Sequence, residues 1–229
     1  MISAINKAIA QMSDPAFRSV LIRSILYSVA ALFVTLIVIL QLASLIPPTD
    51  WEWVNTIIDW LAGFGAFLIA LFLFPVTMSA VIGIFLDDIA DAVEAKHYPT
   101  DPAPRQIPLW SSIWDSVKFF GVIIACNIVA LPLYLIPVVN LFVYYTLNGY
   151  LLSREFFQQV AVRHHDMKVV NGLRKFEYME IFLTGVAIAF FMTIPILNLI
   201  IPIVATATMV HLYKDRARKV VSTSKDVSL

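Results

Sequence analysis

The first residues that could bind an anion precede the first long apolar run of the chain. Asp14 is followed by proline, which is a typical start of a helix. The backbone N–H groups of Ala16, Phe17 and Arg18 come directly after that start, so we expect them to have no acceptor inside the helix. With the Arg18 guanidinium they predict an anion site at this helix end. The alternative is that Arg18 and Arg23 only anchor the helix at the lipid headgroups.

A second set of candidate groups comes from a turn that occurs twice. Ile-Pro-Val-Val-Asn-Leu at 136–141 matches Ile-Pro-Ile-Leu-Asn-Leu at 194–199, and each copy lies inside a long uncharged block. Proline interrupts a helix, and Asn140 and Asn198 are good N-caps, so a new helix is expected to begin one residue after each asparagine. A helix N-terminus at membrane depth would attract an anion, with the asparagines lining its path. Alternatively, each asparagine only caps its own helix.

Composition places these groups in an integral membrane protein. Hydrophobic residues make up 60% of the 229 residues, and charged residues make up 14%. The 16 basic and 16 acidic residues balance, which argues against nucleic acid as a partner. One cysteine, Cys126, excludes an internal disulfide and a cysteine-based metal site. No cofactor or metal is predicted, because the four histidines have no metal-ligand spacing; they are His97, His164, His165 and His211.

The uncharged blocks predict an all-α membrane protein with two full transmembrane helices, two re-entrant (hemi-penetrating) helical hairpins and interfacial amphipathic helices. The arms that return from the two turns, 141–153 and 199–213, have 13 and 15 residues before a charge. Crossing the hydrocarbon core takes about 20 residues, so these arms are too short unless the bilayer thins. The expected segments of this single membrane domain are an interfacial helix at 1–13, long transmembrane helices at 15–46 and 53–96, a first hairpin at 109–156, a cytoplasmic connector at 157–180 and a second hairpin at 181–219.

Two of these segments are expected to be amphipathic. In residues 1–13 the apolar side chains fall on one helical stripe, which comprises Ile2, Ile5, Ile9 and Met12. After the second long apolar run, four carboxylates share a helix face that we expect to be solvated, although they could also hold a cation; they are Asp87, Asp88, Asp91 and Glu94.

The basic residues predict the orientation. All 16 Lys and Arg precede the uncharged run of the first long helix, at 24–49, or follow that of the second, at 60–86. By the positive-inside rule that side is the cytoplasm, so both termini of this multi-pass protein are expected there.

Several stretches of the chain are similar to one known family. They are Thr-Ile-Pro-Ile-Leu-Asn-Leu-Ile-Ile-Pro-Ile-Val-Ala-Thr-Ala-Thr at 193–208, Tyr-Lys-Asp-Arg at 213–216 and Gly-Tyr-Leu-Leu-Ser-Arg-Glu at 149–155. The sequence with these stretches resembles the CysZ sulfate-permease family of bacterial inner membranes. The resemblance implies a protein that takes up sulfate for cysteine synthesis and assembles in the lipid bilayer as a homo-oligomer, a dimer or larger.

The resemblance also implies where sulfate binds. The family's motif, Pro-Gly-(Ile or Leu)-Arg-Arg-Phe, corresponds here to Pro-Ala-Phe-Arg-Ser-Val at 15–20. The implied sulfate-binding residues are therefore Ala16, Phe17, Arg18 and Ser19. The candidates along the path come from the sequence pattern instead: Arg23 follows Arg18 in the same helix, and Asn140 and Asn198 belong to the repeated turns. Ser19 replaces an arginine, and a hydrogen bond to a charged group contributes about 1.5–3 kcal/mol. We therefore expect either weaker sulfate binding than in the family or a sulfate site at another place in the chain.

Two functions follow. The first is a sulfate permease, either channel-like or proton-coupled, without an ATP-binding loop of its own. The second is a membrane-organising or assembly protein that transports nothing, which the altered arginine motif favours. An enzyme is not predicted, because the uncharged blocks contain no Asp, Glu or Lys.

Overall fold

The structure is a computed structural model that describes the whole chain except residues 46, 48, 106–107 and 227–229. Every regular element among the described residues is helical, which confirms the predicted all-α class. The elements are α1 (Ile2–Ala10), the 3₁₀ turn η1 (Gln11–Ser13), α2 (Pro15–Ser44), α3 (Glu52–Trp60), the π-helical turn η2 (Leu61–Gly65), α4 (Ala66–Ile84), α5 (Leu86–His97), α6 (Leu109–Tyr134), α7 (Val139–Ala161), α8 (Met167–Phe176), α9 (Tyr178–Met192), α10 (Pro195–Asn198) and α11 (Ile201–Asp226).

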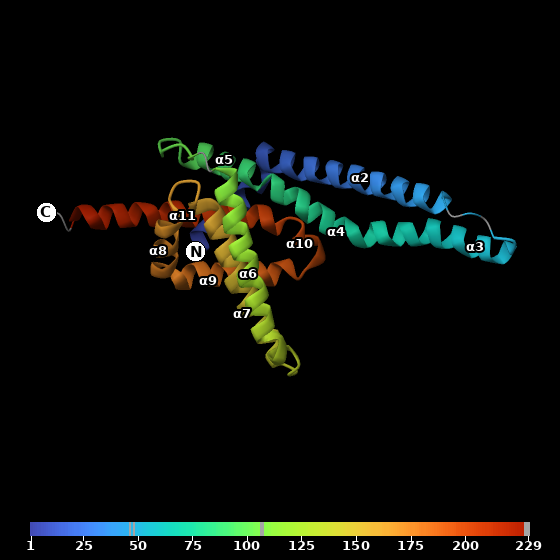
Figure 1. Cartoon of the computed structure of the whole chain (residues 1–229). Helices are drawn as coiled ribbons and strands as arrows, with labels where there is room; N and C mark the ends of the chain where they lie inside the picture. The colour runs from blue at the N-terminus through green and yellow to red at the C-terminus, as the bar shows by residue number, and fades with distance from the viewer. Residues whose placement is uncertain (46, 48, 106–107, 227–229) are drawn as a thin grey trace.

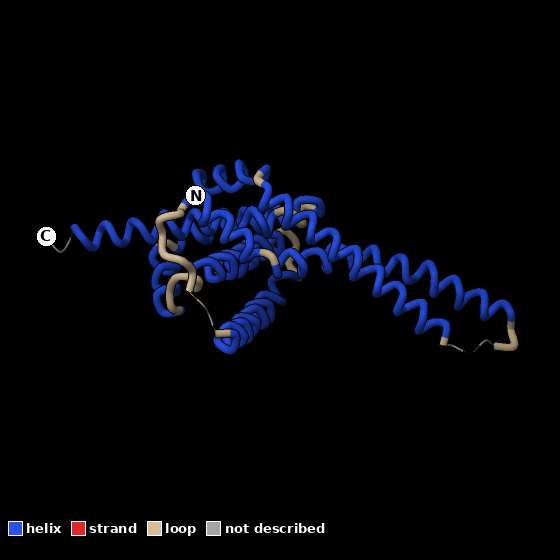
Figure 2. Tube along the Cα trace, turned by 90° about the horizontal axis from the view of Figure 1, so that it is seen from above, coloured by secondary structure: helices blue, strands red, loops and turns tan. Residues whose placement is uncertain are grey.

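Two long helical hairpins extend from a central bundle. In the first hairpin, one arm is α2, and the other arm consists of α3, η2 and α4 in succession (Figure 1). The other consists of α6 and α7, and it runs crosswise to the first (Figure 1). Seen from above, α6 is viewed nearly end-on while α2 lies along the picture (Figure 2), so the two views agree. The bundle itself comprises α1, α5, α8, α9, α11 and the C-terminal part of α7. Their buried side chains form the core together with Phe17 and Val20 of α2 and Met78 and Ile82 of α4.

Three helical segments, rather than the two predicted, are long and apolar enough to cross a membrane within the described part of the chain. They are Pro15–Leu42, Glu52–Phe74 and Ile113–Tyr134. The sequence places the third in a re-entrant hairpin, because the short returning arm of that hairpin predicts a shallow insertion. Its ascending arm, α6, has 26 residues, or about 39 Å of helix.

Apolar side chains on these helices are exposed, as expected for surfaces that contact lipid. Along α2 and α6 they include Ile22, Leu26, Phe33, Val34, Ile128, Val129 and Leu131. Because a contiguous apolar surface of this extent is rare on soluble proteins, it supports the assignment to a membrane.

The closest helix contact in the bundle joins α7 and α9. A Cβ atom added at Gly185 would lie 2.1 Å from the carbonyl oxygen of Gly149 and 2.5 Å from Cβ of Ser153. A Cβ atom added at Gly149 would lie 2.5 Å from Cγ2 of Val186. Small residues therefore let the two backbones touch, as in many pairs of membrane helices.

The repeated turn has a different geometry in each copy. In the first copy Val138 has a positive φ of 69°, and α7 begins at Val139, before Asn140. In the second copy Pro195 begins the one-turn helix α10, which ends at Asn198, and the chain then turns into α11. The prediction that each asparagine caps a new helix was therefore wrong. Proline fits the first position of a helix, so in the second copy it begins a turn of helix ahead of the asparagine.

Helix α1 packs on α11 through small residues. Ala4 and Ala8 are 1% and 0% exposed, whereas Ile2 and Ile9 are 69% and 52% exposed. Ile2 and Ile9 of the predicted stripe thus face outward, whereas Ile5 and Met12 are half-buried. The alanines form the contact with the bundle because their small side chains permit close approach.

Candidate functional site

The start of α2 has the backbone geometry that the sequence predicts. Asp14 has extended backbone angles, φ −67° and ψ 143°, and α2 begins at the next residue, Pro15. The N–H of Arg18, however, donates to the carbonyl oxygen of Asp14 at 3.1 Å. The prediction that this N–H lacks an acceptor was therefore wrong, because the helix closes its first hydrogen bond one residue earlier than expected.

The other predicted site residues are arranged in different ways. The Arg18 side chain is exposed. The Phe17 side chain is 1% exposed and belongs to the core. The hydroxyl of Ser19 donates to the carbonyl oxygen of Ala16 at 2.8 Å, so its proton is already used within the helix. Arg18 is therefore the predicted residue best placed to meet an anion with its side chain.

Other basic groups come to the start of α2 from distant parts of the chain. Lys96, near the end of α5, donates to both carboxylate oxygens of Asp14 at 2.9 and 2.8 Å. Asp14 and Arg18 are four residues apart and so lie on the same side of the helix. Lys96 and Lys7 also act on the next residue, His97, whose pKa is lowered by desolvation and by these two positive charges. We call Lys7, Arg18, Lys96 and His97 the α2-start cluster.

The α2-start cluster could not be found from sequence spacing alone. Lys96 is 82 positions from Asp14. The order of the helices could have predicted it, because α5 follows the second arm of the long hairpin and therefore returns to the end of the hairpin where α2 starts. The negative charge of Asp14, which the sequence places next to the anion site, is compensated by Lys96.

The remaining path candidates lie in three separate places. Arg23 is exposed on α2. Asn140 is exposed at the tip of the hairpin of α6 and α7, and Asn198 ends α10 at the tip between α9 and α11. The two tips point in different directions (Figure 1). The structure therefore does not bring Asn140 and Asn198 together.

A buried group of charged residues lies beside the cluster, inside the bundle. Glu94 accepts from Nε2 of His164 at 2.8 Å and lies 3.8 Å from Nζ of Lys214 and 3.8 Å from Arg163. Burial alone would raise the pKa of Glu94, but the hydrogen bond from His164 and the nearby positive charges lower it overall. Glu94 was predicted to belong to a solvated helix face, and that was wrong; it is 8% exposed, whereas Asp91 on the same helix is exposed.

A second buried polar chain connects α11 to the N-terminus. The Tyr98 hydroxyl is 2.9 Å from Nδ1 of His211, and Nε2 of His211 is 3.2 Å from Oε1 of Gln11. Desolvation, with smaller contributions from His97 and Lys7, lowers the pKa of His211 to about 4. The ring is therefore neutral at pH 7, and donation from Tyr98 to Nδ1 and from Nε2–H to Gln11 satisfies both nitrogens.

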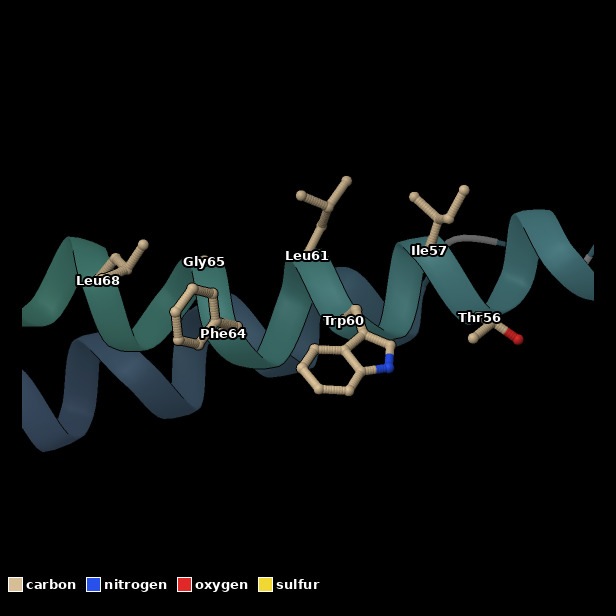
Figure 3. A pocket seen from close by; sticks show the side chains of 7 residues that line it. All are labelled: Thr56, Ile57, Trp60, Leu61, Phe64, Gly65 and Leu68. Atoms are coloured by element: carbon tan, nitrogen blue, oxygen red, sulfur yellow. The ribbon is translucent and has the colours of Figure 1, made fainter.

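A groove of 330 Å³ on the distal part of the long hairpin lies along α3, η2 and the start of α4 (Figure 3). Trp60, Leu61, Phe64 and Leu68 line it, and Thr56 contributes the one hydroxyl among its lining residues. This lining does not suit a sulfate ion, because it offers no positive charge.

Comparison with known proteins gives one family. The family described as "Sulfate transporter CysZ/Etoposide-induced protein 2.4" matches residues 4–202. No curated protein matches the chain. The matched residues include the α2-start cluster, both hairpins and the first two residues of α11.

Proposed function

The chain belongs to the family of sulfate transporter CysZ and etoposide-induced protein 2.4, and on that premise we propose that it is a sulfate permease. It takes sulfate across the bacterial inner membrane, either as a channel-like path or coupled to protons, and supplies sulfur for cysteine synthesis. It works as a homo-oligomer with both termini in the cytoplasm.

The observation that carries this proposal is the α2-start cluster. Lys96 is paired with Asp14 at the helix start, Lys7 and Lys96 both act on His97, and Arg18 follows Asp14 by four residues on the helix. Because the negative charge of Asp14 is neutralised by this ion pair, the remaining positive charges raise the local concentration of a divalent anion. Arg18 is the residue that we place on the anion, because its guanidinium can donate two parallel hydrogen bonds to one oxyanion.

Sulfate flux into liposomes that contain the purified protein tests the proposal. We expect sulfate to enter faster than phosphate, and Arg18→Ala to reduce the rate. Lys175→Ala removes an equal charge from an exposed position on α8 and is expected to leave the rate unchanged. If Arg18→Ala and Lys175→Ala transport sulfate equally well, the site is not at the start of α2.

A second candidate function rests on the same region. The Ser19 hydroxyl is bound to Ala16 and Phe17 is buried, so the start of α2 offers an anion fewer side-chain groups than the family motif would. This favours a protein that organises the membrane or assists assembly without transport. A folded oligomer with no flux of any anion tested would move this candidate to first place.

A further inference from the structure

A large cavity lies between α6 and α7, and none of its lining residues belongs to the α2-start cluster. Its volume is 1180 Å³. Its walls are the first half of α6, the last half of α7, the start of α5 and three residues that precede α6, which are Pro104, Arg105 and Pro108. It is therefore a wedge between two antiparallel helices, one of which is long enough to cross the membrane.

The cavity lining changes from polar to apolar along α6. Asp115 and Ser116 line it near the helix start, whereas Phe119, Phe120 and Ile123 line it further along. The start of α6 carries Trp110 and Trp114, both exposed, and tryptophans favour the headgroup level of a bilayer. The polar part of the cavity thus lies at headgroup level and the apolar part lies deeper.

Most charges that line the cavity are already paired. The pairs are Arg105 with Asp166, Arg163 with Asp87 and Lys118 with Asp115. Glu155 on α7 is the exception: no described residue forms an ion pair or hydrogen bond with its carboxylate. Although the side chain is exposed to the cavity, the surrounding protein desolvates the carboxyl group and raises its pKa. Burial disfavours the charged form of such a carboxylate, and a bound cation would stabilise that charged form.

The residues next to Glu155 indicate which chemical class of cation the cavity would bind. Gln158 and Gln159, one turn further along α7, add amide oxygens to the same wall. A carboxylate with amide oxygens accepts several hydrogen bonds, which suits an ammonium group with N–H donors better than a quaternary ammonium. The apolar wall of Phe119, Phe120 and Ile123 suits a hydrocarbon chain.

We propose that this cavity binds a phospholipid whose headgroup ends in a primary ammonium, as phosphatidylethanolamine does. The ammonium donates to Glu155 and to the amide oxygens of Gln158 and Gln159. One acyl chain packs along Phe119, Phe120 and Ile123. The bilayer is the source of the ligand, because α6 exposes an apolar surface to it and the cavity lies on the flank of that helix.

Lipid retention measured by native mass spectrometry tests the proposal. The purified protein is exchanged into equal mixtures of phosphatidylethanolamine, phosphatidylcholine and phosphatidylglycerol, and the bound lipids are counted. We expect about a tenfold preference for phosphatidylethanolamine, the factor that one charge-assisted hydrogen bond provides. Glu155→Gln should abolish that preference. Asp88→Asn removes a charge from an exposed position on α5 that does not line the cavity, and it should retain the preference.

A second variant shows where the lipid lies. Ile123→Trp fills the apolar part of the cavity and should reduce retention of all three lipids while the helical content, measured by circular dichroism, stays the same. Equal retention of the three lipids by the wild-type protein would overturn the proposal. Preference unaffected by Glu155→Gln, or retention unaffected by Ile123→Trp, would also overturn it. Sulfate flux is not part of this readout, so the result is independent of the transport function.

Discussion

Acidification from pH 7 to pH 5 is expected to destabilise the protein through His211. This ring is fully buried between Tyr98 and Gln11, and its pKa is about 4, against an ordinary value of 6.5. In the unfolded chain the same histidine takes up a proton near pH 6.5. The folded protein therefore binds fewer protons than the unfolded chain at any pH between these values, and its stability falls as the pH is lowered.

The size of the effect follows from the two pKa values. Each unit of difference corresponds to about 1.36 kcal/mol between the protonation states. The free energy of unfolding should decrease by about 2 kcal/mol between pH 7 and pH 5, and by about 3 kcal/mol by pH 4. The pKa of Glu94 is lowered from 4.5, so the ionised carboxylate stabilises the folded protein. This contribution to the free energy of unfolding is lost only below the interval from pH 7 to pH 5. Glu155 responds in the opposite sense to His211, because its raised pKa makes the folded protein bind the additional proton on acidification. Comparison with a variant that lacks only the His211 ring therefore separates the two contributions.

The assay is unfolding of the detergent-solubilised protein, followed by circular dichroism at pH 7 and pH 5. His211→Gln serves as the comparison, because the amide can accept from Tyr98 and donate to Gln11 but cannot take up a proton in this range. We expect the variant to be less stable at pH 7 but to lose about 2 kcal/mol less than the wild type on acidification. The same loss in both proteins would refute the argument that His211 remains neutral when buried.

Three further predictions concern packing and the α2-start cluster. Gly185→Ala should lower the free energy of unfolding by about 1–3 kcal/mol, because the new Cβ would meet the backbone oxygen of Gly149; Gly172→Ala, where nothing lies within 4 Å, should have little effect in the same denaturation assay. Lys96→Ala should weaken sulfate binding, measured by calorimetry, but change stability by at most about 1 kcal/mol, because its ion pair is largely exposed; unchanged binding would remove Lys96 from the site. Ser19→Arg should strengthen sulfate binding by about tenfold or more, since it adds a charge-assisted donor; an unchanged dissociation constant would contradict this.

The features that could be predicted are those set by neighbouring residues. The start of α2 at Pro15 was confirmed, because a cap residue and a proline are local signals. The all-helical class was confirmed for the same reason: the long uncharged blocks must satisfy their backbone groups internally.

The features that could not be predicted depend on contacts between distant residues. Asp91 and Glu94 belong to the same helix, and only the second is buried, because His164 approaches it from 70 positions away. The two copies of the repeated turn differ although their sequences match. One difference outside the repeat is Pro202, which falls in the first turn of α11, where a proline is tolerated; α7 has no proline at that distance.

The crosswise arrangement of the two hairpins has a consequence for the surrounding lipid. A bilayer has one normal, so both hairpins cannot follow it in the same molecule. The hairpin that is tilted further from the normal extends sideways among the lipids of one leaflet. The molecule then occupies more area in that leaflet than in the other. Such an asymmetric inclusion acts as a wedge, and we expect the protein to concentrate where the membrane is curved.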